Sequence, residues 1–113
     1  GTGLGSGVFV DGMLVPNVEL GTVPYKDYER FEFYASDAAR KREDLSYKKW
    51  GKRFKKFLRF TETTFSPDLI ILGGGASKKT EKFKEALEIE TLVKSAKYEN
   101  NAGIIGAAMT AVQ

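Results

Sequence analysis

Two glycine clusters, each beside a strand-like segment, constrain the fold of this chain more than any other feature. The first occupies residues 1–7 (GTGLGSG), and the second, residues 73–75, directly follows the apolar run at residues 69–72 (LIIL). Glycine permits the positive φ of tight turns and lets backbone N–H groups approach an anion with no Cβ in the way. Two turns of this kind beside strands predict an α/β protein that handles phosphate groups.

Length and composition narrow the possible classes. The 113 residues are enough for one domain and its core. Cys and His are both absent, which excludes disulfides and thiolate metal sites and leaves acid–base chemistry to Asp, Glu, Lys or Tyr. With no signal-peptide pattern and no apolar run near the roughly 20 residues of a membrane span, we expect a cytoplasmic protein. Because residue 1 is a Gly inside a turn motif, we expect a piece of a longer protein.

The first two thirds of the chain predict a hairpin and two helices. Short β-type runs at residues 7–10 and 13–15 flank Asp11-Gly12, a strong hairpin signal. Apolar periodicity predicts a helix over residues 27–42 with Asp27 as its N-cap. A second helix is expected from the Ser46 cap to about Phe65. Its apolar face is formed by Trp50, Phe54, Phe57, Leu58 and Thr61.

The last third alternates between strand and helix signals. Residues 69–72 predict a buried strand, and Ser77 is placed to cap a helix that runs to about Leu87. Residues 92–93 with 96–98 suggest a last strand, and residues 102–112, rich in Gly and Ala, suggest a closing helix. This order predicts an α/β layered domain with a mixed sheet.

A basic stripe crosses the second predicted helix. At helical spacing, Lys48, Lys52, Lys55 and Arg59 fall on one line, with further cations beside it and almost no acids between residues 46 and 61. Such a face could bind a polyanion such as polyphosphate, with the salt sensitivity known from nucleic acids. The ordinary alternative is a solvated helix face. Both interpretations stay open on the sequence.

Four segments resemble one family in order and spacing. They are GTGLGS at residues 1–6, VPNVELG at 15–21, SPDLIILGGGASKK at 66–79 and NNAGIIGAA at 100–108. Together they resemble the ROK-type sugar kinases, and more narrowly the polyphosphate-dependent glucokinase branch, over nearly the whole chain.

The resemblance implies an actin-like, ribonuclease H-like fold of two lobes, of which this chain would be the C-terminal lobe with its first strand missing. It implies phosphoryl transfer from polyphosphate or ATP, with Mg²⁺, to the 6-hydroxyl of glucose, and a homodimer of the full protein. The catalytic Asp base is expected in the missing N-terminal lobe, so no catalytic residue or metal ligand is assigned here and the chain alone is expected to be inactive. Without that first strand, the sheet is expected to have a gap at its centre.

The resemblance also implies two phosphate-binding turns. Backbone N–H groups of the first turn would contact the transferring phosphate, although a plain glycine-rich β-turn is the simpler alternative. The second turn, beside a helix start, would hold the donor's phosphates, although a tight strand-to-helix connection also explains part of it. The residues concerned are Gly1, Thr2, Gly3 and Gly5 in the first turn, and Gly73, Gly74, Gly75, Lys78 and Lys79 in the second.

Glu19 and Thr22 are the implied sugar-binding residues. A carboxylate accepts hydrogen bonds from two adjacent hydroxyls, which suits a pyranose, although an exposed loop Glu has the same appearance in sequence. Thr22 stands where the family usually has His, which weakens the assignment to glucose. The rival interpretations are a kinase that uses ATP alone and a non-catalytic ROK-like module that senses sugar or binds a polyanion or nucleic acid.

Overall fold

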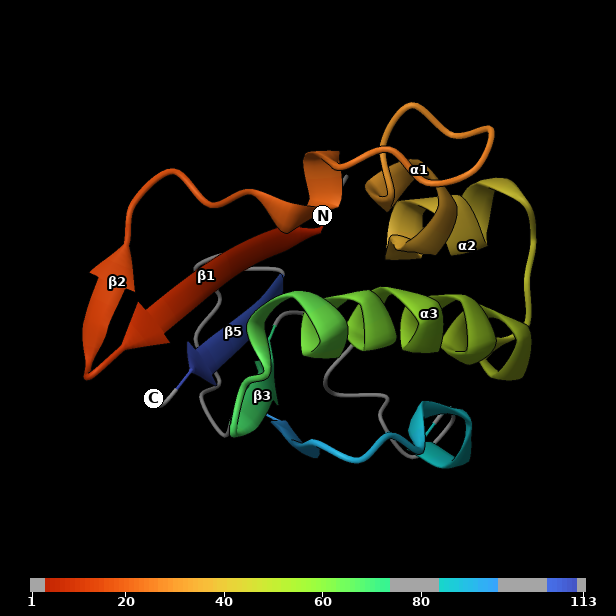
Figure 1. The fold of residues 1–113 in the computed structure, drawn as a ribbon. Helices are drawn as coiled ribbons and strands as arrows, with labels where there is room; N and C mark the ends of the chain where they lie inside the picture. Colours follow the sequence, from red (N-terminus) through yellow and green to blue (C-terminus); the bar gives the residue numbers. More distant parts are fainter. Residues whose placement is uncertain (1–3, 74–83, 96–105, 112–113) are drawn as a thin grey trace.

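The computed structural model describes residues 4–73, 84–95 and 106–111, and its central element is a five-stranded mixed sheet (Figure 1). The strand order is β2-β1-β5-β3-β4. The bounds are Gly5–Val10 for β1, Met13–Val15 for β2, Leu69–Leu72 for β3, Leu92–Ser95 for β4 and Gly106–Ala111 for β5. The helices are η1 (Leu20–Thr22), α1 (Glu32–Ala35), α2 (Asp37–Arg42), α3 (Tyr47–Phe65) and η3 (Lys84–Leu87).

The β1–β2 hairpin is confirmed, and its turn has the expected chemistry. Asp11 has φ 52° and Gly12 has φ 79°, and Val10 pairs with Met13 across the two residues. Positive φ at both central positions matches the right-handed twist of the flanking strands, which is why Asp-Gly is favoured there.

The long helix α3 is confirmed at both ends. The Ser46 hydroxyl accepts a hydrogen bond from the Lys49 amide at 3.1 Å, and the helix ends at Ser66, which has the left-handed φ of 47°. All five residues of the predicted apolar face are buried. The four apolar ones, which are all but Thr61, form one core with Val8, Ile70 and Leu72 of the sheet, so α3 is fixed against the sheet by its apolar face.

The single helix predicted over residues 27–42 is wrong, because the chain forms α1 and α2 with a break at Ser36. Ser36 is extended, with ψ 161°, and its hydroxyl accepts a hydrogen bond from the Ala39 amide at 3.1 Å. The Trp50 indole of α3 donates to the carbonyl oxygens of Ala35 (2.9 Å) and Ser36 (3.1 Å). The break therefore persists because a local cap and a buried donor replace the helical hydrogen bonds.

The expected N-cap Asp27 also has a different role. Tyr25 and Tyr28 exchange two backbone hydrogen bonds, at 3.1 and 2.8 Å, so Asp27 lies in a tight turn ahead of α1. Tyr25 stacks on Phe31 with ring centroids 4.2 Å apart, which ties this turn to the core.

The closing helix predicted over residues 102–112 is also wrong in its described part, which is the strand β5. This strand pairs in parallel with β1 and antiparallel with β3. Each of those strands would otherwise have an open edge at the centre of the sheet, and inserting β5 supplies partners for both rows of backbone groups. The expected central gap is therefore filled, and tertiary pairing overrides the helical preference of an Ala-rich segment.

The remaining predictions are confirmed in part. Residues 69–72 form β3, and residues 92–95 form β4, which pairs in parallel with it. Residues 84–87 form the short 3-10 helix η3 where the end of an α-helix was expected. The other parts of those two predictions, residues 77–83 and 96–98, lie outside the described residues. The described residues therefore do not test whether helices cover both faces of the sheet.

Candidate functional site

The start of β1 and the end of β3 lie at the same edge of the sheet. In the strand register Ser6 of β1 and Leu72 of β3 both pair with Ala107 of β5, from opposite sides. Neighbouring strands are about 4.8 Å apart, so the two backbones are separated by about 10 Å at this level. The segment that precedes β1 and the segment that follows β3 therefore leave the sheet at one edge, which we call the glycine edge.

Only part of the predicted phosphate-binding set can be located. Gly5 is the first residue of β1 and belongs to the strand, not to the turn before it, and Gly73 directly follows β3. The other seven residues of that set, Gly1, Thr2, Gly3, Gly74, Gly75, Lys78 and Lys79, lie outside the described residues. Their roles stay predictions.

The loop that carries Glu19 and Thr22 is fixed to the start of β1. Its η1 turn buries Leu20 and Gly21. The Leu20 amide donates to the Ser6 hydroxyl at 3.1 Å, and this hydroxyl donates to the Val18 carbonyl at 3.5 Å. A Cβ added at Gly21 would lie 2.5 Å from the backbone oxygen of Leu4, so only Gly fits this approach. The predicted sugar loop and the first strand thus meet at the glycine edge.

Glu19 and Thr22 are both exposed on this loop. The Thr22 hydroxyl donates to the Glu19 carbonyl at 2.7 Å, so its proton is used within the turn while its oxygen can still accept a hydrogen bond. Within the described part of the chain the Glu19 carboxylate has no hydrogen bond or ion pair. Both side chains are therefore placed where they can accept hydrogen bonds from a polyol.

Ser6 is the positioning residue that the sequence did not reveal. Its hydroxyl orders the backbone on both sides of Glu19 through contacts 12 and 14 residues away in sequence. No local pattern predicts such a contact, because it depends on how the loop returns to β1.

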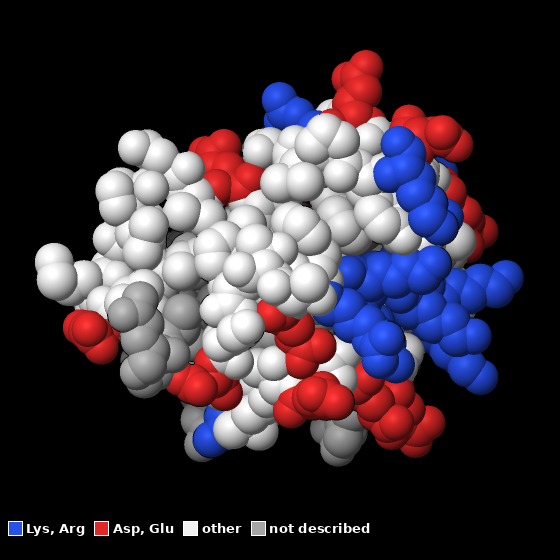
Figure 2. All heavy atoms as spheres, in the orientation of Figure 1, with Lys and Arg blue, Asp and Glu red and all other residues white. Residues whose placement is uncertain are grey.

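The basic stripe of α3 forms a cationic patch on the surface, visible as the blue cluster in Figure 2. The α3 cationic face comprises Lys48, Lys49, Lys52, Lys55, Lys56 and Arg59. All but Lys55 are exposed, and Lys55 is half-buried. In the part of the chain that the structure describes, none of the six has an ion pair with a carboxylate.

Arg53 lies beside this face but has a structural role. Its guanidinium donates to both carboxylate oxygens of Glu43, at 2.8 and 2.9 Å, and to the Tyr34 carbonyl at 3.1 Å. It also stacks over the Tyr34 ring, 4.5 Å from the centroid. The hydrogen bond from Arg53 lowers the pKa of Glu43, and the same bond raises the pKa of Arg53. Arg53 thus joins α1 and the turn after α2 to α3.

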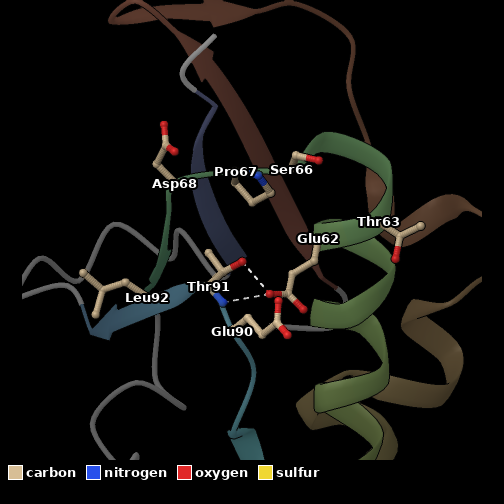
Figure 3. A pocket seen from close by; sticks show the side chains of 8 residues that line it. All are labelled: Glu62, Thr63, Ser66, Pro67, Asp68, Glu90, Thr91 and Leu92. Carbon is tan, nitrogen blue, oxygen red and sulfur yellow. Dashed lines mark hydrogen bonds between the residues drawn. The ribbon is translucent and has the colours of Figure 1, made fainter.

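An acidic pocket lies at the opposite edge of the sheet, where β3 and β4 begin (Figure 3). Its lining includes the carboxylates of Glu62, Asp68 and Glu90. Glu62 accepts hydrogen bonds from both the amide and the hydroxyl of Thr91, which ties α3 to the start of β4. Three carboxylates would repel phosphate, so this pocket does not fit a phosphoryl donor.

Two further properties concern the described residues alone. Among them, no group of three or more acidic side chains is arranged to hold a metal ion. Among them, too, no helix is long and apolar enough to cross a membrane.

Comparison with known proteins identifies clear relatives, although no protein-family model matches the chain. Polyphosphate glucokinase of Mycobacterium tuberculosis (strain H37Rv) is 42% identical over 112 residues, which is 99% of this chain and 42% of that protein. The Mycobacterium leprae protein of the same name is 38% identical over 109 residues, 96% of this chain and 33% of that protein.

A solved structure agrees with these relatives. Inorganic polyphosphate/ATP-glucomannokinase from Arthrobacter sp. strain KM superposes with a TM-score of 0.75 at 33% identity, over 92% of this chain and 45% of that one. The chain thus spans less than half the length of each protein it matches. Over nearly all of its own length, this chain is a homologue of the polyphosphate glucokinases.

Proposed function

We propose that the chain forms the phosphate-binding and sugar-binding part of a glucokinase that transfers a phosphoryl group from polyphosphate or ATP to the 6-hydroxyl of glucose. The observation that carries the proposal is the identity of 42% across 99% of the chain to polyphosphate glucokinase. In this proposal the chain corresponds to the second lobe of an actin-like ROK kinase. The whole protein would be a cytoplasmic homodimer whose first lobe supplies the Asp base.

The glycine edge supports this assignment, because the start of β1, the end of β3 and the loop with Glu19 lie there. The start of β1 and the end of β3 are about 10 Å apart, which is room for a phosphoryl group between the two predicted phosphate-binding turns. The loop with Glu19 is joined to the start of β1 through Ser6. Phosphoryl transfer depends mainly on positioning and charge stabilisation, and backbone N–H groups of rigid turns provide both.

Each segment has a distinct part in the proposed reaction. Glu19 accepts hydrogen bonds from two neighbouring glucose hydroxyls, and the Thr22 oxygen accepts a third. The first turn binds the transferring phosphoryl group, and the second turn binds the rest of the donor. The bond from phosphorus to the donor's bridging oxygen breaks as the bond to the sugar oxygen forms, and the hydroxyl proton passes to the base of the other lobe.

Mg²⁺ is expected to arrive with the donor's phosphates. The described residues contain no cluster of carboxylates that fits a metal ion, and Mg²⁺ in proteins is commonly held by one or two carboxylates together with substrate phosphates.

A chimaera tests the proposal. The corresponding 112 residues of the M. tuberculosis polyphosphate glucokinase would be replaced by this chain, and glucose phosphorylation measured with polyphosphate and with ATP. We expect activity with at least one donor, and a large rise in the KM for glucose in the Glu19→Gln variant. Glu29→Gln, at another exposed loop Glu, is the matched control. A folded chimaera without phosphorylation, or equal effects of the two substitutions, would overturn the proposal.

A further inference from the structure

We propose that the α3 cationic face is an extended binding site for linear inorganic polyphosphate. The inference rests on the proposed function, because it assigns a place on this chain to the polymeric donor. It goes further in naming a helix surface that is not one of the glycine edge segments as the track along which the polymer lies.

The geometry of the face suits a long, regularly charged ligand. Residues 48 to 59 lie on one continuous helix, and at 1.5 Å per residue they span about 16 Å. Cations three or four residues apart stand one above another on the helix surface. The opposite side of α3 is buried in the core, so the six cations are carried by a rigid support.

The charge of the face is not neutralised within the described chain. The α3 sequence has seven Lys and Arg but only one acid, Glu62. Glu62 is hydrogen-bonded to Thr91. Glu43, which follows α2, accepts hydrogen bonds from Arg53 and is therefore not available to the six cations of the face. Pairs such as Lys48 with Lys52 and Lys55 with Arg59 are like charges four residues apart and repel each other. A bound polyanion would relieve this repulsion.

Polyphosphate fits the face better than a nucleic acid does. Proteins that bind single strands without sequence preference combine cations with exposed aromatic rings on which bases stack. On α3, Trp50, Phe54 and Phe57 are buried in the core, and Tyr47, Phe60 and Phe65 are half-buried, so no aromatic ring of this helix is fully exposed. The face therefore offers mainly charge, which is what a polymer of phosphates without bases requires.

The test is direct binding to the 113-residue chain, with fluorescence-labelled long-chain polyphosphate as the probe. The variant Lys52→Gln/Lys55→Gln/Arg59→Gln removes three charges from the face. The control Lys26→Gln/Arg30→Gln/Lys94→Gln removes three exposed charges elsewhere, so both chains fall from a net charge of +3 to zero. Gln keeps a helix propensity close to that of Lys and Arg.

We expect the face variant to bind at least about tenfold more weakly and the control to change by about twofold or less. The salt slope of log K should fall by about 2 in the face variant, because three phosphate contacts at roughly 0.7 each are lost. We also expect long-chain polyphosphate to bind more tightly than tripolyphosphate, since only the polymer spans the face. Equal losses in the two variants, or equal affinity for both chain lengths, would overturn the inference.

Two further measurements test the folding of the variant and the identity of the polyanion. Lys48→Gln/Lys49→Gln takes two cations from the first turn of α3, where they oppose the helix dipole, so this second variant should fold well and still bind more weakly. Competition by single-stranded DNA at equal phosphate concentration should be weak, and equal competition would overturn the assignment to polyphosphate. If the unsubstituted chain does not bind polyphosphate although the chimaera is active, this inference alone is refuted. If the unsubstituted chain binds polyphosphate through the face although the chimaera is inactive, the proposed function is refuted.

Discussion

Replacing Gly21 by Ala is expected to destabilise the packing of the loop that carries Glu19 against the start of β1. Gly21 is buried in η1, and a Cβ there would lie 2.5 Å from the Leu4 oxygen and 3.2 Å from the Leu4 Cβ. The nearer of these atoms is a backbone oxygen just before β1 and cannot rotate away. The loop must therefore move by almost 1 Å to reach an ordinary contact of 3.4 Å.

The packing of this site allows an estimate of the loss in free energy of unfolding. Forcing an extra methyl into a filled site costs about 1–3 kcal/mol. With a urea m-value of about 2 kcal/mol/M, a loss of about 2 kcal/mol lowers the unfolding midpoint by about 1 M. The same movement displaces Glu19, two residues away, so the chimaera carrying Gly21→Ala should also have a higher KM for glucose.

Urea unfolding followed by the fluorescence of Trp50, the one Trp of the chain, measures the effect on stability. Gly7→Ala is the control, because a Cβ there meets side chains at an ordinary 3.4 Å. We expect Gly7→Ala to unfold within about 0.5 kcal/mol of the parent, as ordinary surface-strand changes do. Equal midpoints for Gly21→Ala and Gly7→Ala would refute the close approach of η1 to β1.

Two other substitutions test the contacts around α3. Trp50→Phe should destabilise the chain by about 1–3 kcal/mol, because the carbonyls of Ala35 and Ser36 lose their indole donor, and unfolding followed by circular dichroism would show it. An unchanged midpoint would contradict the role of Trp50 at the helix break. Glu43→Gln should be less stable than the parent at neutral pH, and the difference should vanish as the pH falls well below 4.5. Arg53 lowers the pKa of Glu43, so the stabilisation is complete above the unfolded pKa and is lost as the pH falls through the folded pKa. Midpoint differences that are independent of pH would contradict this ion pair.

The sequence predicted those elements whose signals are local. The start of α3 follows from Ser46, its buried face from the spacing of Trp50, Phe54 and Phe57, and the hairpin from Asp11-Gly12. Each depends on residues within a few positions of one another, so contacts with distant parts of the chain did not change the predicted structure.

The two incorrect helices failed for a different reason. The break at Ser36 depends on an indole donor that arrives from 14 residues away, and β5 depends on the open edges of β1 and β3. The residues of the candidate site differ in the same way between local and long-range signals. Glu19 and Thr22 are predicted from their motif, and their role stays a prediction, whereas the role of Ser6 arises only when the loop folds back onto the strand.

The position of β5 determines when the sheet can be completed during synthesis. Gly5 pairs with Gly106, roughly a hundred residues later in the chain, and such long-range pairing is slow to form. Until that segment has left the ribosome, β1 and β3 each keep an unpaired edge that another nascent chain could occupy. Production of this protein should therefore depend on conditions that protect open strand edges, such as slow translation, low temperature or abundant chaperones.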